Sequence, residues 1–194
     1  ALLMFLALGL LQWAPPRWER WLVACLAGAL FLLAALAPWV YIAPVHARPT
    51  SISAEELRHL AQPAQITFGD AIDLVGVRVD QAARAGGWLT LDLYWKALRP
   101  IDEDLWLTIS LAGDDPAGPL VVKDGSPTAG HDTTDRWQAG EILPSHHRLL
   151  VPAHAEEGTY GVWIGIHPFG EWAWLPTQPE QAISLHLADV QITR

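Results

Sequence analysis

The stretch from Trp21 to Ala43 constrains this chain most. It reads WLVACLAGALFLLAALAPWVYIA, and its twenty-three residues include no Asp, Glu, Lys or Arg. At a rise of about 1.5 Å per residue such a helix is roughly 34 Å long, enough to cross a hydrocarbon core about 30 Å thick. Trp18 lies near one end and Trp39 and Tyr41 near the other, where aromatic rings favour the headgroup level. The sequence therefore predicts a transmembrane helix, with a buried core helix of a large soluble protein as the alternative.

A second charge-free run, ALLMFLALGLLQW, opens the chain, and the segment 14–20 separates the two runs. We expect residues 1–43 to form two transmembrane helices in a hairpin, the first of them truncated. The two arginines of the loop 14–20 favour the cytoplasm. The rest of the chain would then lie on the extracytoplasmic side of the cell membrane, as part of a multi-pass protein with the lipid bilayer as a partner.

The charge of the chain is concentrated after this apolar part. The net charge is −9, and only Arg17, Glu19 and Arg20 precede Pro44. The acidic remainder has the usual size of one domain with its own core. Its charge argues against binding nucleic acid and against docking on anionic lipid through a basic face. Cys25 is the single cysteine, so no intrachain disulfide is possible.

Residues 44–64 are predicted to form a stalk between the two parts. The segment begins at Pro44 and has a second proline at Pro63 near its end. Thr50 and Ser53 are both suitable N-caps for a short helix that carries acidic residues in its first turn.

From residue 65 to 194 the hydrophobic pattern has a period of two. In GWLTLDLYWKA the residues Leu89, Leu91, Leu93 and Trp95 share one face, as expected for a half-buried strand. Comparable alternation places Leu105, Leu107, Ile109 and Leu111, and then Tyr160, Val162, Ile164 and Ile166, on inward faces. Further candidate strands are Ile72 to Val79, Leu120 to Lys123, Ile142 to Val151 and Ile183 to Ile192. Seven to nine short strands separated by Gly, Pro and Asp turns predict an all-β antiparallel sandwich, jelly-roll-like or immunoglobulin-like.

The order of landmarks in this region resembles the soluble domain at the C-terminus of bacterial family-39-like membrane glycosyltransferases, which are similar to the dolichyl-phosphate-mannose protein mannosyltransferases. The segments that carry the resemblance are ITFGDAIDLVGVRVD, GGWLTLDLYWKAL, VVKDGSPTAGHDTTDRWQAGE, LLVP and GTYGVWIGIHPFGEWAWLP. The single features that match are Leu93-Tyr94-Trp95, Asp124, Pro127, Gly130, Thr133 or Thr134, Trp137, Gly140-Glu141, Pro152, Gly158, Tyr160, Gly165 and Leu175-Pro176. Where an aspartate is expected shortly after Gly140-Glu141, this chain has Pro144-Ser145.

This resemblance implies a GT-C transferase that moves a sugar from a lipid-phosphate donor, using acidic residues in early extracytoplasmic loops that would precede this chain. The chain would then be a non-catalytic C-terminal portion whose partners are the upstream membrane domain and a glycan or lipid-linked sugar. No catalytic residue and no cofactor are assigned to it.

Three aspartates form the only candidate metal site, for Ca²⁺. Asp124, Asp132 and Asp135 offer oxygen ligands of the kind that Ca²⁺ takes. The alternative is a turn in which Asp and Thr side chains bond to local backbone amides. Zinc is not expected at His146-His147, because neighbours in a strand point to opposite faces.

Tryptophan is abundant, with 11 residues in the chain. Trp106 and Trp163 fall on the outward register of their strands, and with Trp137 they are candidates for stacking on sugar rings. The alternative is that this face packs against the membrane domain or a returning loop. Trp172 and Trp174 would equally suit a loop dipping toward the bilayer interface.

Three functions therefore stay open. The chain is the C-terminal part of a membrane glycosyltransferase, a membrane-anchored carbohydrate-binding domain without transferase activity, or a structural domain that fixes partners at the cell surface.

Overall fold

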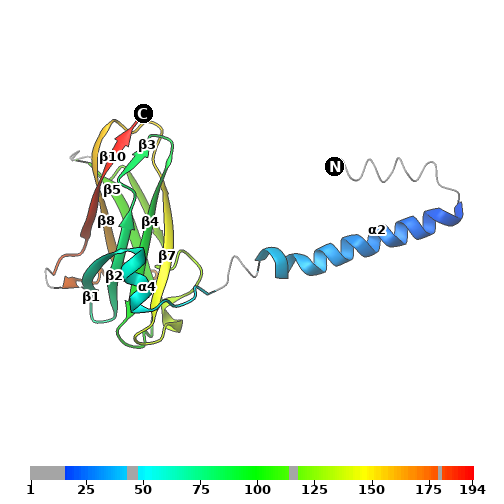
Figure 1. Cartoon of the computed structure of the whole chain (residues 1–194), viewed down its shortest axis with the longest axis horizontal. Helices are drawn as coiled ribbons and strands as arrows, with labels where there is room; N and C mark the ends of the chain where they lie inside the picture. The colour runs from blue at the N-terminus through cyan, green and yellow to red at the C-terminus, as the bar shows by residue number, and fades with distance from the viewer. Residues whose placement is uncertain (1–15, 43–47, 114–117, 179–180) are drawn as a thin grey trace. The chain divides into compact units, whose positions relative to one another are not determined.

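The computed structural model describes residues 16–42, 48–113, 118–178 and 181–194. The chain divides into two units, Ala1–His46 and Ala47–Arg194. Figure 1 shows the elements of both units.

The first unit contains one apolar helix. Helix α2 (Pro16–Ala37) continues into the π-helical turn η1 (Pro38–Ile42). The segment Trp21–Val40 is long and apolar enough to cross a membrane, and none of it is buried within the protein. The wider turn begins at Pro38, which has no N–H to donate to the preceding turn. The other helix of the expected hairpin, residues 1–13, lies outside the described residues.

The second unit is a sandwich of two five-stranded sheets (Figure 1), which confirms the predicted fold class. The strands are β1 (Gln62–Phe68), β2 (Ile72–Val79), β3 (Ala82–Arg84), β4 (Trp88–Ala97), β5 (Leu105–Ala112), β6 (Val121–Gly125), β7 (Ile142–Leu150), β8 (Gly158–Pro168), β9 (Thr177–Gln178) and β10 (Leu185–Thr193). The first sheet has the order β7-β4-β2-β1-β9 and the second the order β3-β10-β8-β5-β6.

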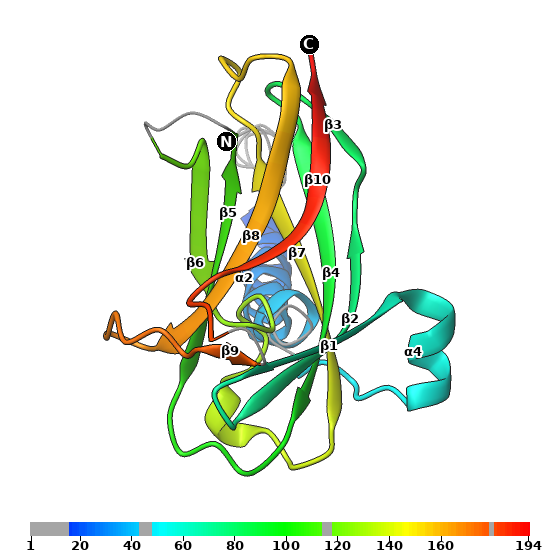
Figure 2. The same ribbon diagram turned by 90° about the vertical axis from the view of Figure 1, so that its left-hand side faces the viewer.

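One strand pair departs from the antiparallel rule. Strand β3 leaves the path between β2 and β4 and joins the other sheet, where it pairs parallel with β10 (Figure 2). The remaining strand pairs are antiparallel. The short β3 therefore ties the edge of the second sheet to the turn between two strands of the first.

The core lies between the sheets and follows the predicted alternation. The inward residues of β4 and β5 are at most 1% exposed, as are Val162, Ile164 and Ile166 of β8. Tyr160, predicted to point inward as well, is half-buried and packs against the core. Burial of these side chains is the main force holding the two sheets together.

A small polar group is enclosed in this core. The Trp95 Nε1–H donates to Ser145 Oγ at 3.1 Å, and Ser145 Oγ donates to the Leu93 carbonyl at 3.2 Å. His147 Nε2 lies 3.0 Å from the Pro127 carbonyl and 3.1 Å from Ser145 Oγ. Ser145 stands where the resemblance leads one to expect an aspartate nearby, and here it satisfies a buried indole.

Residues 48–61 of the predicted stalk pack against the sandwich. Helix α4 (Ala54–Leu60) begins with a capping box between Ser53 and Glu56. Its Leu57 lies over Gly76 of β2, where an added Cβ would be 2.7 Å from the Leu57 side chain. The Ile52 N–H donates to the Ile142 carbonyl at 3.0 Å. This segment therefore covers part of the outer face of the first sheet, beside β1 and β2 (Figure 2).

An arginine clasp holds the start of the same segment. Arg48 Nε donates to Asp132 Oδ2 at 2.6 Å, and its Nη2 donates to Glu141 Oε2 at 2.7 Å and to the Arg136 carbonyl at 3.1 Å. The Asp132 side chain is fully buried, whereas that of Arg48 is 34% exposed. We call the contacts of Arg48 with Asp132 and Glu141 the Arg48 clasp.

Candidate functional site

The outer face of the second sheet carries the candidate site. Outward residues of β5 alternate with its core residues and include Trp106, Thr108 and Ser110. Strand β8 pairs with β5 so that Trp163 lies opposite Ser110 and Gly165 opposite Thr108. The predicted outward register of Trp106 and Trp163 is therefore confirmed, and Trp163 is 37% exposed.

Two glycines keep this face flat enough for aromatic rings. A Cβ at Gly165 would lie 2.7 Å from the Trp174 ring, and a Cβ at Gly161 would lie 2.8 Å from Trp163 Nε1. Any larger residue at either position would displace an indole. The alternation of glycine with Trp163 along β8 is thus the local sequence feature that makes room for the rings.

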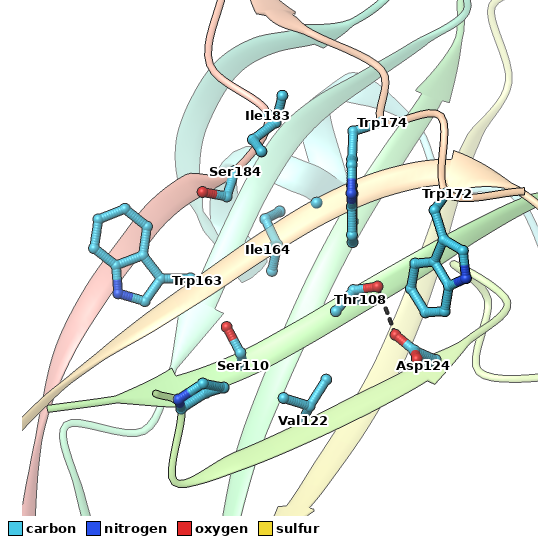
Figure 3. A pocket seen from close by; sticks show the side chains of 12 residues that line it. Thr108, Ser110, Val122, Asp124, Trp163, Ile164, Trp172, Trp174, Ile183 and Ser184 are labelled. Atoms are coloured by element: carbon cyan, nitrogen blue, oxygen red, sulfur yellow. Dashed lines mark hydrogen bonds between the residues drawn. The ribbon is translucent and has the colours of Figure 1, made fainter. Parts of the chain in front are cut away.

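The segment that follows β8 folds back over the sheet and completes a groove of about 340 Å³ (Figure 3). Strands β5 and β6 form its floor, and three indoles stand around it. We call this the indole groove, and it is lined by Thr108, Ser110, Pro119, Val122, Asp124, Trp163, Ile164, Gly165, Trp172, Trp174, Ile183 and Ser184.

His167 supports the two indoles that come from the returning segment. Its ring stacks on Trp172 with a centroid separation of 5.1 Å, and it meets Trp174 edge-on at 4.9 Å. His167 Nδ1 lies 2.9 Å from both the Pro168 and the Glu171 carbonyls, so this nitrogen carries the proton, because carbonyl oxygens only accept. Its Nε2 is buried without a partner among the described residues. His167 thereby fixes the turn that presents Trp172 and Trp174.

Polar groups lie on the floor of the groove, between the indoles. Thr108 Oγ1 donates to Asp124 Oδ1 at 2.5 Å, which joins β5 to β6 across the floor. Ser110 and Ser184 add hydroxyl groups at other points of the lining. The arrangement is a mainly apolar, aromatic groove with a few polar groups, which is typical of small-molecule binding sites.

The three tryptophans predicted to stack on sugar rings lie in different surroundings. Trp163 lines the indole groove. Trp106 lies on the same outer face but packs on Phe169, with ring centroids 4.8 Å apart, and does not line the groove. Trp137 is 3% exposed and belongs to the core, so it is no part of this surface. A core tryptophan that follows a 3₁₀ turn cannot be told from a surface one by sequence periodicity.

The sequence suggests for Trp172 and Trp174 a loop that dips toward the bilayer interface and does not single them out for sugar stacking, whereas in the structure both line the indole groove. They come from a loop without strand alternation, so their place over Gly165 depends on tertiary packing. The glycines at positions 161 and 165, on either side of Trp163, are the sequence feature that could have indicated an aromatic ring packed on this strand.

The three candidate calcium ligands make separate contacts. Asp124 lies in the indole groove, and Asp132 is held in the Arg48 clasp. A second arginine, Arg136, approaches Asp132 Oδ1 at 3.5 Å, while Asp135 is exposed. Within the described ranges no group of three His, Cys, Asp or Glu side chains is placed to hold a metal ion. The buried carboxylate of Asp132 is paired with arginines, which offset the cost of burying its charge.

His146 and His147 point to opposite faces, as expected. His146 Nδ1 lies 2.6 Å from Asp92 Oδ1 on the outer face of the first sheet, where Arg78 also pairs with Asp92. His147 is buried between the sheets, and desolvation lowers its pKa to about 4.

No protein-family model and no curated protein matches the chain. Among solved structures, the C-terminal domain of Wzt is similar at 8% identity and a TM-score of 0.47, over 69% of this chain and 81% of that one. A Niemann-Pick type C2 protein from the Japanese carpenter ant is similar at 7% identity and a TM-score of 0.42, over 66% and 99%. A β-glucosidase from Listeria innocua in complex with glucose has 12% identity and a TM-score of 0.38, over 63% of this chain and 16% of the enzyme. Likenesses this distant do not bear on a ligand.

Proposed function

We propose that the sandwich is a glycan-binding domain anchored to a membrane by the helix of residues 16–42. The single observation that carries this proposal is the gathering of Trp163, Trp172 and Trp174 around one groove with a polar floor. The sugar would lie in the indole groove.

The chemistry of the groove suits a sugar ring. Indole faces are flat and apolar, and they match the C–H faces of a pyranose, while hydroxyl and carboxylate groups pair with the sugar hydroxyls. Thr108, Ser110 and Asp124 supply such groups on the groove floor. The volume of about 340 Å³ falls at the small end of the range for ligand sites, so one or two rings would be held.

The family resemblance supplies a setting for this activity. In a family-39-like glycosyltransferase this chain would be a non-catalytic C-terminal portion, and the groove would hold the acceptor glycan or the sugar of a lipid-linked donor. The domain would then lie on the extracytoplasmic side of a multi-pass protein, as the arginines of residues 14–20 favour. We assign no catalytic residue within the chain.

The test is glycan binding by the whole chain in polyoxyethylene detergent micelles, which contain no sugar. Titration calorimetry against a panel of neutral oligosaccharides is expected to give saturable binding to at least one of them. Trp163→Ala and Trp174→Ala should each weaken that binding by about tenfold or more, because an aromatic contact of this size is worth about 1 kcal/mol beyond its buried area.

Trp88→Ala is the matched control. Trp88 is 51% exposed on the first sheet, where Arg148 lies 4.6 Å over its ring, so its loss removes an exposed indole outside the groove. Circular dichroism confirms that each variant is folded. Two results would contradict the proposal: a folded chain that binds none of the glycans, or a Trp88→Ala variant whose glycan binding is weakened as much as that of the groove variants. Either result would favour the structural role at the cell surface.

A further inference from the structure

The described lining of the indole groove contains a single charged side chain. Among its described lining residues Asp124 is the one ionisable group, and no Lys, Arg or His is present. Asp124 also makes no ion pair within the described part of the chain. The groove therefore carries a negative charge that the domain itself does not neutralise.

The position of this carboxylate is set by the sheet. Asp124 lies in β6 directly across from Thr108 of β5, and the Thr108 hydroxyl donates to its Oδ1. One oxygen is thus held against the floor, and a carboxylate of this kind keeps further acceptor sites on its second oxygen. A bound ligand meets a pre-oriented acceptor rather than a mobile side chain.

The surroundings of Asp124 favour a cation on the ligand. The faces of indole rings attract ammonium groups through their quadrupoles, and a carboxylate forms a charge-assisted hydrogen bond with the same group. A uronic acid or a sugar phosphate would instead be repelled by Asp124, and the described lining residues include no basic side chain to offset that repulsion. The net charge of −9 on the chain adds a long-range attraction for cations.

We propose, building on the glycan-binding function above, that the indole groove selects glycans bearing a protonated amino group, which pairs with Asp124 while the sugar ring stacks on the indoles. Asp124 is a specificity-determining residue in this proposal. Neutral glycans bind more weakly, through stacking and hydrogen bonds with the groove floor, and acidic glycans are rejected.

The test uses oligomers of one backbone that differ at a single substituent. A short chitosan oligomer carries an ammonium, the chitin oligomer an acetamide and the cellulose oligomer a hydroxyl; a second such set is built on galactosamine, N-acetylgalactosamine and galactose. Binding to the whole chain in polyoxyethylene micelles is measured by calorimetry at mildly acidic pH, where the sugar amines are protonated. The ammonium oligomer of at least one set should bind about three- to tenfold tighter than its neutral partners, and added salt should reduce this preference.

Asp124→Asn is the deciding variant, because the amide oxygen still accepts from Thr108 while the charge is lost. It should bind ammonium and neutral oligomers equally, because the preference for the ammonium group depends on the carboxylate charge. Asp102→Asn removes the same charge from an exposed loop outside the groove and should keep the full preference.

Two failures are distinguishable. If neutral and ammonium oligomers bind equally to the wild-type chain, or if Asp124→Asn keeps the preference, the selection for amino sugars is wrong and glycan binding stands. If no oligomer of either set and no other glycan binds, the glycan-binding function itself is wrong, and the selectivity fails with it.

Discussion

His146 and His147 are neighbours in β7 with opposite surroundings. The side chain of His146 is 61% exposed and pairs with Asp92, whereas His147 is 2% exposed between the sheets. Burial lowers the pKa of His147 to about 4, although the nearby Pro127 carbonyl favours its charged form. The fold therefore keeps this imidazole neutral where an unfolded chain would protonate it.

This difference predicts a loss of stability in mild acid. As the pH falls from about 6.5 toward about 4, His147 binds a proton in the unfolded chain but stays neutral in the folded chain. The free energy of unfolding should decrease over this window by up to about 3 kcal/mol. Above about pH 6.5 the neutral His147 causes no such loss. In His147→Gln, whose amide still donates to Pro127, this part of the pH dependence should vanish.

The measurement is urea unfolding at several pH values, followed by tryptophan fluorescence. His154→Gln, which removes an exposed histidine, is the control and should keep the wild-type pH dependence. If the free energy of unfolding varied with pH equally in wild type and His147→Gln, the pKa of His147 would not be lowered by folding.

At the scale of elements, an ion-pair cluster holds the start of the docked segment 48–61. Arg48 is the main counter-charge for Asp132, whose carboxylate is fully buried, while Arg136 lies farther away at 3.5 Å. Removing one partner of such a pair leaves an uncompensated buried charge, which costs more than the pair itself contributes.

Arg48→Met should therefore destabilise the sandwich by about 1–3 kcal/mol, the lower figures applying because Arg48 is partly exposed. Hydrogen exchange should quicken across residues 48–61. Asp132→Asn in the Arg48→Met background should restore much of the lost stability, since the buried charge is then gone. Arg58→Ala, an exposed position in α4, is the matched control. An unchanged denaturation midpoint in Arg48→Met would mean that Arg136 alone neutralises Asp132.

Elements with a strong local pattern were predictable, and those without one were not. Strand β2 has the predicted bounds, Ile72 to Val79, because polar turn residues bound its apolar run at both ends. Strands β3 and β9 contain three and two residues, too few to show a period. Strand order was beyond the sequence as well, because it depends on pairings between distant residues.

The same distinction holds for the candidate site. The outward position of Trp163 follows from the period of two in β8, and it was predicted. The placement of Trp172 and Trp174 was not, because it depends on contacts with His167 and Gly165 that only the folded sheet brings near. The burial of Trp137 was missed for the same reason.

At the scale of the whole molecule, the apolar helix predicts that the chain is retained in membranes. Phe31 lies near the middle of Trp21–Val40. An arginine there costs about 2.5–3.5 kcal/mol for insertion into a bilayer, whereas near the helix end the side chain reaches the interface. Phe31→Arg should therefore release much of the chain from membranes washed with alkaline carbonate, and Trp18→Arg should release little.

Immunoblotting of pellet and supernatant gives the measurement. Retention of Phe31→Arg equal to that of wild type would show that this helix is not the anchor. Recovery of the domain as a shorter soluble chain would identify residues 16–42 as a cleaved signal sequence instead.

The parallel pairing of β3 with β10 has a consequence for biosynthesis. Ala82 pairs with Gln191, about a hundred residues later, and β10 carries the core residues Val190 and Ile192. A ribosome adding about 5–20 residues per second needs roughly 5–20 s to cover that separation. During this interval the nascent domain exposes an incomplete apolar layer, and β8, once it has been made, has an unpaired edge until β10 follows. The hydrophobic helix has emerged earlier. We therefore expect a chaperone that covers exposed apolar surface to raise the yield of folded domain during synthesis.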